Sequence, residues 1–359
     1  MHTLRLRVDP ERMEDARTEL ALDQALDQAA AILREGGTVA VPTETVYGLG
    51  ANALDEKAVA AIFEAKERPG WDPLIVHVCD AAMLAVVVES VPEAARKLID
   101  AFWPGPLTLL LQRSARVPDA VTAGRALVGV RMPAHPVARE LIRRAGVPIA
   151  APSANRFGHT SPTTAEHVLE DLDGRIDAVV DAGPTAVGVE STVADATGSP
   201  IVIYRPGAVT LEQICAVAGA AEMYVERDGL ESAPRGSMPS PGVGLRHYAP
   251  RARLILVEAA DASSAAALLR EKSLELEGER VGVMWVDGTP VGENAPDGID
   301  WTVFRWGRWA DPEELAHRLF AGLRYLDAAG CSVILCPMPP KEGIGAAMRD
   351  RLRKAAAAG

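Results

Sequence analysis

The sequence predicts an α/β protein built from two domains, and three observations support this prediction. Helical and strand-like patterns alternate along most of the chain. The alternation stops between about residues 222 and 252, where prolines and glycines are dense, and it resumes afterwards. A chain of 359 residues is also long for a single hydrophobic core. We therefore expect one domain at residues 1–220, a linker at 221–252 and a smaller domain at 253–359.

The expected elements of the first domain begin with a helix. Residues 18–37 repeat leucine and alanine at helical spacing and stop at a glycine pair. Residues 38–42 (TVAVP) then predict a short buried strand, and residues 55–69 predict a second helix. Further strand-like runs follow in this order: PLIVHV, LTLLLQ, ALVGVRMP, VPIAAPS, DAVVDAG and SPIVIYRPG.

Two capping boxes predict where further helices begin. In each, a threonine is followed three residues later by a glutamate or glutamine, and the pairs are Thr163 with Glu166 and Thr210 with Gln213. Beyond the linker, the runs RLILVE, RVGVMWV, WTVFRW and CSVILCPMP alternate with helical stretches such as DPEELAHRLFAGLRYLDAAG. This alternation is typical of a small open α/β sheet.

The composition argues against several classes of protein. No apolar run is long enough to span a bilayer, and the charged N-terminal segment lacks the apolar core of a secretory signal, so we expect a cytoplasmic protein. The four cysteines form no CxxC pair, which argues against a zinc site or a disulfide framework. The net charge of −12 argues against a binder of the phosphate backbone, because such proteins need clustered lysines and arginines.

The stretch FEAKERPGWDPLIVHV, at residues 63–78, places two cations at the end of the second expected helix. Lys66 falls on the apolar face of that helix, at helical spacing from residues 59, 62 and 63. Pro69 disfavours the α region for Arg68, so both cations can turn toward one spot. A positive helix C-terminus that complements the macrodipole is one interpretation. The position of Lys66 favours the other, an anionic ligand such as a polyphosphate.

Polar side chains also follow two of the expected strands. Thr43, Glu44 and Thr45 follow the first strand and precede Gly48 and Gly50, a weak glycine-loop signal for which a plain turn is the more common explanation than a ligand site. The strand VPIAAP opens into SANRFGHTSPTT, whose possible hydrogen-bond donors are Ser153, Asn155 and Ser161. α/β sheets place ligands at the carboxyl ends of strands. Because polar side chains follow two such ends, we expect both ends to line one cleft.

Further polar residues interrupt or end other strands. His77 lies between two valines, where a lone histidine is more often a core residue than a catalyst. Arg131 in VGVRMP needs a partner if the strand is buried. Ser191 in GVESTV and Arg205 in IYRPG have similar positions. Together with Lys66 and Arg68 they would give one cleft with four cations and no dominant nucleophile, which suits the positioning of a nucleotide.

Two other catalytic interpretations lack their motifs. No G-x-S-x-G elbow is present, so a Ser-His-Asp hydrolase is not supported. GIGAAMRDRLRK in the second domain begins like a dinucleotide loop but lacks the third glycine and a downstream acidic residue, which makes a cofactor site there a poor prediction.

Many motifs of the chain, taken in order, resemble one known family. They are PTETVYGLGANA, AKERP, PLIVH, FWPGPLT, VRMPAHP, PIAAPSAN, GVESTV, RPG and the linker motif SPG with RHYAP. They are similar to those of the threonylcarbamoyl-adenylate synthases, in the two-domain form. The resemblance covers nearly the whole chain and is densest at residues 38–250. It implies a YrdC-like twisted-sheet catalytic domain and a smaller, Rossmann-like open α/β C-terminal domain.

The resemblance also implies an activity. Family members make L-threonylcarbamoyl-AMP from ATP, L-threonine and bicarbonate, with magnesium, and release pyrophosphate, so the chain would be a nucleotidyltransferase. The product serves the threonylcarbamoyladenosine modification of tRNA. We therefore expect downstream threonylcarbamoyl-transfer proteins as partners and no membrane association, and we expect any contact with RNA to be local or indirect.

The resemblance assigns roles to individual residues. Lys66 and Arg68, the KxR motif, would be catalytic and would bind ATP with Ser153 and Asn155, the SxN motif. Further ATP contacts would come from Asp72, where the family usually has asparagine, the backbone of Leu127, and Ser161, Arg205 and His247. Threonine would be held by Thr45, His77, Arg131, Ala151 and Ser191, which makes His77 a ligand contact rather than a core residue. No side chain is assigned to a metal.

Two alternative functions remain. Carbamoyl-adenylate chemistry of the hydrogenase-maturation type would need zinc-finger modules, whose CxxC pairs are absent here. The acidic charge balance argues against a non-catalytic RNA-binding module.

The linker also has two interpretations. It carries Arg246, His247 and Tyr248, and it is either a solvated tether or a lid that closes over the cleft.

Overall fold

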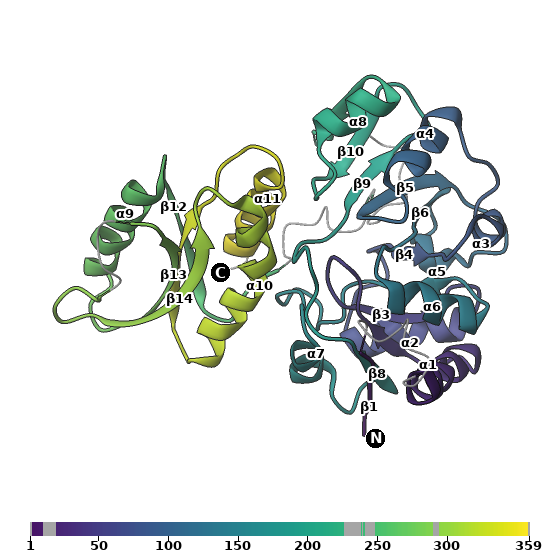
Figure 1. Cartoon of the computed structure of the whole chain (residues 1–359), viewed down its shortest axis with the longest axis horizontal. Helices are drawn as coiled ribbons and strands as arrows, with labels where there is room; N and C mark the ends of the chain where they lie inside the picture. Colours follow the sequence, from purple (N-terminus) through teal and green to yellow (C-terminus); the bar gives the residue numbers. More distant parts are fainter. Residues whose placement is uncertain are drawn as a thin grey trace. The chain divides into compact units, whose positions relative to one another are not determined.

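The computed structural model of the chain describes residues 2–9, 19–225, 238, 240, 248–289 and 294–357, without the side chains of residues 19–23. The fold is mixed α/β, with one large twisted sheet and one small sheet, which confirms the predicted fold class (Figure 1). The described residues form two compact units. The first unit lies within residues 1–157, 162–186 and 190–244, and the second lies within 158–161, 187–189 and 245–359. His247 and most of the predicted linker lie outside the described residues.

The first unit contains the large sheet. Its strands are β1 (Leu4–Arg7), β2 (Val39–Val41), β3 (Gly48–Asn52), β4 (Ile75–His77), β5 (Leu107–Gln112), β6 (Leu127–Arg131), β7 (Ile149–Ala150), β8 (Ala178–Asp181), β9 (Thr192–Asp195), β10 (Ile201–Arg205) and β11 (Ala221–Met223). They lie in the order β1-β8-β2-β3-β7-β4-β6-β5-β9-β10-β11. β11 pairs in parallel with β10, within the range predicted as linker.

The helices of the first unit connect these strands. They are α1 (Glu19–Arg34), α2 (Glu56–Lys66), α3 (Ala81–Val87), α4 (Glu93–Phe102), α5 (Asp119–Thr122), α6 (Pro136–Ala145), α7 (Ala165–Leu172) and α8 (Leu211–Ala218). The capping box at the start of α8 is confirmed, with both hydrogen bonds between Thr210 and Gln213 present. The one predicted for Thr163 is wrong. Thr164 is the N-cap of α7, because its backbone is extended and its hydroxyl accepts the His167 N–H.

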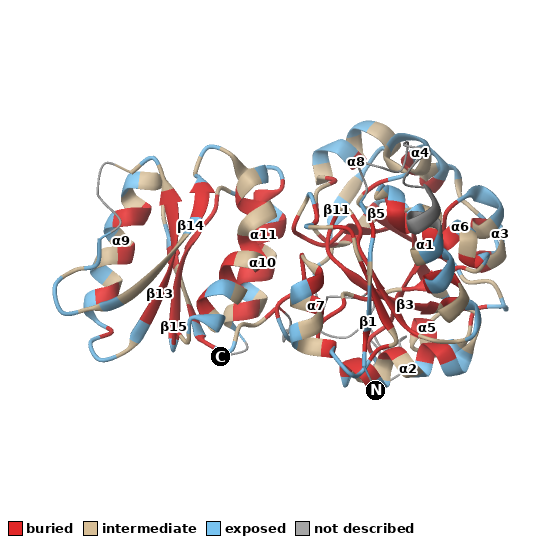
Figure 2. Ribbon diagram, turned by 60° about the horizontal axis from the view of Figure 1, so that its bottom comes forward, coloured by how far each residue is buried: buried red, intermediate tan, exposed pale blue. Residues whose placement is uncertain are grey.

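The two faces of the large sheet have different neighbours, because side chains alternate along each strand. One face packs against helices in a large core, in which Val76 of β4 meets residues such as Ile62 of α2. On the other face, Val39 and Val41 of β2 pack with residues of α1 and α6. Figure 2 shows that the strands of both sheets are mostly buried.

Further along the second face, the sheet carries a small apolar cluster. It consists of Ile75, Leu110 and Val193, with Leu127 and Tyr204 packed against it. All five residues lie in strands, and in the described part of the chain no helical residue joins this cluster. The second face of β4, β6, β5 and β9 is therefore the part of the sheet on which polar strand residues can gather.

The second unit is a small parallel sheet between helices. β12 (Arg253–Glu258), β13 (Arg280–Asp287), β14 (Asp300–Arg308) and β15 (Val333–Met338) lie in the order β12-β15-β13-β14. Figures 1 and 2 show α9 (Ala262–Leu274) on one face, and α10 (Pro312–Ala328) and α11 (Gly345–Ala356) on the other. The segment 158–161 belongs to this unit, where Arg324 donates to the Thr160 carbonyl at 2.5 Å.

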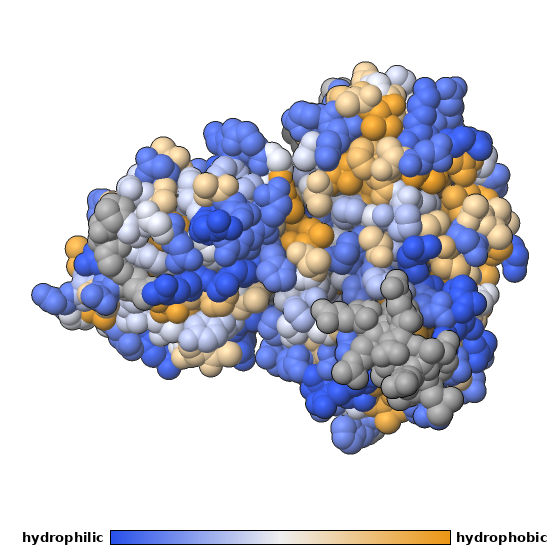
Figure 3. Space-filling view, viewed as in Figure 1, coloured by the Kyte–Doolittle hydropathy of each residue, from blue (hydrophilic) through white to orange (hydrophobic). Residues whose placement is uncertain are grey.

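The surface is largely polar. Figure 3 shows hydrophilic residues over much of the visible face of each unit. The exposed large hydrophobic side chains among the described residues are Leu4, Trp71, Met223, Val225, Leu274 and Tyr325. None of the described helices is both long and apolar enough to cross a membrane. All four cysteines are free thiols.

Candidate active site

Neighbouring strand ends bring several predicted site residues together on the second face of the large sheet. β4 and β6 pair in parallel, and their register places His77 beside Arg131. Ser191, just before β9, lies 2.8 Å from the hydroxyl of Thr108 on β5. Ala151, just after β7, donates its backbone N–H to Ile75 of β4 at 2.9 Å. Four of the five residues predicted to hold threonine therefore lie in or next to strands of one continuous part of the sheet, β7-β4-β6-β5-β9.

Arg131 is buried, and each of its three guanidinium nitrogens lies close to a protein oxygen. Its Nη1 donates to the Thr45 hydroxyl at 2.9 Å, and its Nη2 lies 2.6 Å from a carboxylate oxygen of Glu44. Its Nε donates to the Gly105 carbonyl at 3.1 Å. A Cβ at position 105 would lie 2.2 Å from the Phe102 carbonyl oxygen, so only glycine brings this carbonyl to Arg131. Burial, the largest single influence, raises the pKa of Glu44, but attraction to Arg131, the hydrogen bond with Arg131 and two backbone hydrogen bonds together outweigh it, so the pKa is lowered.

Arg205 and Ser191 form a second polar group at the end of β10. The Arg205 Nε donates to the Ser191 carbonyl at 3.0 Å, and its Nη2 donates to the Ser191 hydroxyl at 3.1 Å. Both side chains are buried. The Ser191 hydroxyl also lies within hydrogen-bond distance of the Thr108 hydroxyl. A ligand bound to Ser191 would therefore alter the hydrogen bonds of both Arg205 and Thr108.

Lys66 connects the KxR and SxN motifs. It is the last residue of α2 and is fully buried on the apolar face, as its helical spacing predicts. Its ammonium donates to the backbone carbonyl of Ser153 at 2.5 Å and to that of Asn155. Burial, and then the neighbouring Arg68, lower its pKa well below the usual range. Lys66 therefore fixes the backbone of the loop that carries the SxN motif.

Arg68 reaches its position because α2 ends at Glu67, which adopts a left-handed conformation with φ of 55°. The Arg68 Nη2 lies 3.0 Å from a carboxylate oxygen of Asp72, and both side chains are buried. It also donates to the carbonyls of Asp72 and Pro73. Burial raises the pKa of Asp72, although Arg68 acts in the opposite direction. Asp72 is thus the partner of Arg68 in this structure.

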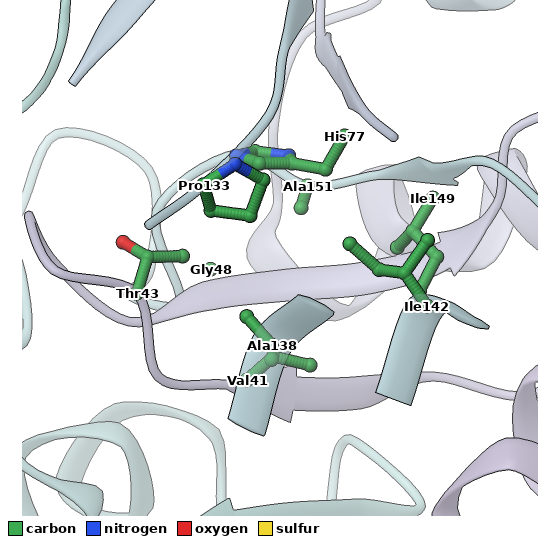
Figure 4. A pocket seen from close by; sticks show the side chains of 9 residues that line it. All are labelled: Val41, Thr43, Gly48, His77, Pro133, Ala138, Ile142, Ile149 and Ala151. Carbon is green, nitrogen blue, oxygen red and sulfur yellow. The ribbon is translucent and has the colours of Figure 1, made fainter. Parts of the chain in front are cut away.

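His77 lines a small apolar cavity (Figure 4), and the register of β4 and β6 places it beside Arg131. It is buried, and its Nδ1 has no hydrogen-bond partner in the described part of the chain. Burial, with a smaller effect from Arg131, lowers its pKa from 6.5 to about 3. His77 is therefore neutral in the folded protein at physiological pH.

The low pKa of His77 predicts how stability depends on pH. Between pH 6.5 and about 3 the unfolded state binds a proton that the folded state does not, so stability falls as the pH falls. Each pH unit should cost at most about 1.4 kcal/mol. Urea unfolding of the wild type and His77→Asn at several pH values tests this. The variant should lose less stability between pH 6.5 and 5, and parallel curves would contradict the assignment.

The structure does not gather every predicted residue in this region. Leu127 and Arg131 lie at opposite ends of β6, roughly 13 Å apart along a strand that rises about 3.3 Å per residue. Ser161 belongs to the second unit, and His247 lies outside the described residues. Sequence reasoning missed Thr108, Gly105 and the pairing of Glu44 with Arg131. A threonine inside the apolar run LTLLLQ was the available signal for Thr108.

Comparison with known proteins gives the family. Residues 31–207 match the family described as Telomere recombination, and residues 209–357 match the family described as Threonylcarbamoyl-AMP synthase, C-terminal domain. A Threonylcarbamoyl-AMP synthase from Pyrococcus abyssi is 45% identical over 333 residues, which cover 91% of this chain and 92% of the relative. One from Bacillus subtilis is 45% identical over 338 residues, covering 93% of each chain.

A solved structure is similar over the whole fold. The crystal structure of P. abyssi Sua5 complexed with L-threonine has a TM-score of 0.85 and 41% sequence identity, and the match covers 100% of this chain and 98% of that chain. The resemblance seen in the sequence motifs is thereby confirmed. Because relatives of this name match over nearly their full length, the chain belongs to the threonylcarbamoyl-AMP synthase family.

Proposed function

We propose that this protein synthesises L-threonylcarbamoyl-AMP from ATP, L-threonine and bicarbonate, with release of pyrophosphate. The observation that carries the proposal is the buried Arg131, held by Glu44 and Thr45 beside His77, in a chain whose structural neighbour binds L-threonine. The product would serve the threonylcarbamoyladenosine modification of tRNA, through downstream proteins that transfer the threonylcarbamoyl group.

In this proposal the threonine subsite is built around Arg131. Its guanidinium would bind the substrate carboxylate, because a planar fork matches the two carboxylate oxygens. Thr45 and Ser191 would supply hydroxyls, while His77 and Ala151 would border the rest of the amino acid. Since Arg131 already meets Glu44, the substrate carboxylate would share or replace that partner.

The ATP subsite would be built from the two motifs that Lys66 joins. Lys66 holds the backbone of Ser153 and Asn155, whose side chains would contact the nucleotide. Arg68 and Arg205 would neutralise phosphate charge, with Arg68 exchanging Asp72 for phosphate oxygens. The threonine carbamate oxygen would then attack the α-phosphorus as the bond to pyrophosphate breaks. The side chains position and neutralise, and none acts as a covalent nucleophile.

Magnesium would be bound mainly by the phosphates of ATP. Mg²⁺ in such sites keeps several waters and takes one or two carboxylates besides phosphate oxygens. Two carboxylates beside proposed ligand residues, Glu44 and Asp72, are each paired with an arginine. Within the described residues no group of three or more His, Cys, Asp and Glu side chains could form a metal site. These residues fit an ion that arrives with ATP, whose charge it would partly neutralise.

The proposed activity is tested by incubating the protein with ATP, magnesium and bicarbonate, with and without L-threonine. We expect pyrophosphate release that requires threonine, together with threonylcarbamoyl-AMP detected by mass spectrometry. Release that does not depend on threonine would contradict the proposal. Release that requires carbamoyl phosphate would instead favour the hydrogenase-maturation chemistry, and RNA binding with no release would favour a non-catalytic module.

The geometry of Arg68 gives a second prediction. Arg68→Lys keeps the charge but loses the fork that can hold two phosphate oxygens, so we expect kcat/KM for ATP to fall by roughly 10- to 100-fold. Arg143→Lys is the matched control, because Arg143 is exposed and pairs only locally with Glu140. If both variants keep full activity with an intact fold, Arg68 serves the helix end rather than ATP.

A further inference from the structure

A small cavity lies beside the proposed threonine subsite. Its volume is about 20 Å³, and its walls are apolar. Figure 4 shows the nine residues that line it, which are Val41, Thr43, Gly48, His77, Pro133, Ala138, Ile142, Ile149 and Ala151. All of them belong to the first unit. The volume suffices for one small molecule.

Water is a poor occupant of this cavity. A buried water needs roughly two to four hydrogen-bond partners. Of the lining side chains, His77, whose Nδ1 has no partner in the described part of the chain, could supply one. Thr43 cannot easily supply a partner, because its hydroxyl already donates to the Val46 carbonyl at 2.6 Å and lies 2.8 Å from the Thr45 hydroxyl. In Figure 4 its oxygen points away from the other labelled side chains. The cavity is therefore suited to a small apolar molecule.

The cavity adjoins the residues proposed to hold threonine. His77 and Ala151 belong to both sets, and the strand register places His77 beside Arg131. Thr43, in the wall, touches Thr45, which in turn binds Arg131. A molecule in the cavity would therefore lie close to a threonine whose carboxylate is held by Arg131.

The charges around the cavity do not favour an anion there. None of the lining side chains is a cation, and Arg131, which the strand register places beside the lining residue His77, is paired with Glu44 at 2.6 Å. In the proposed complex it is also needed by the threonine carboxylate. His77 is buried and carries no charge at neutral pH. Bicarbonate, a hydrated anion, would enter an apolar space without a free cation, whereas carbon dioxide would enter at little cost.

We propose that this cavity holds carbon dioxide, and that carbon dioxide rather than bicarbonate is the form of inorganic carbon that reacts with threonine. The inference rests on the proposed function and names the reacting species of its third substrate. The threonine ammonium loses one proton to solvent, and the free amine attacks the carbon of carbon dioxide. A C–N bond forms as one C=O π bond becomes a carboxylate oxygen, and the nitrogen releases a second proton. No water has to leave, as it would from bicarbonate.

The time course of pyrophosphate release just after mixing distinguishes carbon dioxide from bicarbonate as the reacting species. At low temperature, carbon dioxide and bicarbonate interconvert slowly without carbonic anhydrase. We expect pyrophosphate release to begin at once when the reaction is started with dissolved carbon dioxide. It should show a lag when it is started with bicarbonate, and carbonic anhydrase should remove the lag. A lag with carbon dioxide and none with bicarbonate would overturn the proposal. Absence of any threonine-dependent release would instead contradict the proposed function.

The cavity itself is tested by filling it. Ala138→Val adds two methyl groups to the cavity wall, and Ala145→Val makes the same change at a buried position of α6 outside the wall. We expect Ala138→Val alone to raise KM for carbon dioxide by about 10-fold, with Tm and KM for ATP nearly unchanged. An increase confined to KM for threonine would overturn the proposal, because the cavity would then hold the threonine methyl group.

Crystals pressurised with carbon dioxide give a readout that does not depend on activity. Density should fill the cavity of the wild type and of Ala145→Val and be absent from Ala138→Val. An empty wild-type cavity under pressure would exclude carbon dioxide as its ligand, whatever the kinetics of the reaction.

Discussion

Replacing Arg131 with methionine is expected to reduce threonine-dependent pyrophosphate release by roughly 100-fold or more, mainly by raising KM for threonine. The guanidinium is the group proposed to hold the substrate carboxylate, and methionine has no donor. The change also leaves the Glu44 carboxylate, with 12% of its side chain exposed, without its cation. Breaking a buried pair on one side costs about 3–5 kcal/mol, so the free energy of unfolding should fall as well.

The loss of stability can be separated from the loss of activity. In the double variant Arg131→Met with Glu44→Gln, the glutamine no longer needs a cation, so much of the unfolding free energy should return. Activity should stay low, because the substrate carboxylate still lacks its partner. Urea unfolding and steady-state kinetics on the two single variants and the double variant measure both effects. Recovery of activity in the double variant would show that Arg131 only neutralises Glu44.

Replacing Lys66 with methionine is expected to reduce activity by roughly 100-fold or more and to weaken ATP binding. The ammonium holds the backbone carbonyls of Ser153 and Asn155, and methionine can donate to neither. Each buried carbonyl left without a donor costs about 1–3 kcal/mol, which the loop can avoid only by moving. That movement displaces the Ser153 and Asn155 side chains from the positions proposed for ATP.

Lys57→Met provides the comparison for Lys66, because Lys57 is exposed on the same helix. It should leave both activity and ATP binding unchanged. Calorimetric titration with a non-hydrolysable ATP analogue measures the affinity without turnover. If Lys66→Met binds the analogue as tightly as the wild type does, Lys66 does not position the nucleotide loop.

The sequence predicted which residues at the strand ends belong to the site better than it predicted which side chains these residues pair with. His77 and Arg131 each interrupt an apolar run, and the register of β4 and β6 places them side by side. The pairing of Arg131 with Glu44 joins residues far apart in the chain, and local patterns do not encode which strands become neighbours. Asp72 lies four residues after Arg68, so this ion pair was within reach of a local interpretation.

Errors in the secondary structure have similar physical causes. Thr163 and Thr164 are adjacent threonines with equal capping potential, and only the backbone conformation selects Thr164 as the N-cap. The sequence pattern predicts no element for AAMLAVV, which forms the short helix α3, because a run of seven apolar residues fits a buried strand equally well. The left-handed Glu67 that ends α2 is not a glycine, so composition gave no sign of it.

The internal pairing of the four cations has a consequence for how ligands exchange. Lys66, Arg68, Arg131 and Arg205 each already have protein oxygens as partners, so the folded protein solvates its own binding groups. A substrate oxygen therefore replaces a protein oxygen at each cation, and the binding free energy is only the difference between the two interactions. We expect such a site to bind its substrates with modest affinity and to need no counter-ion when empty. In the proposed function, the same exchange of oxygens would favour release of the adenylate product.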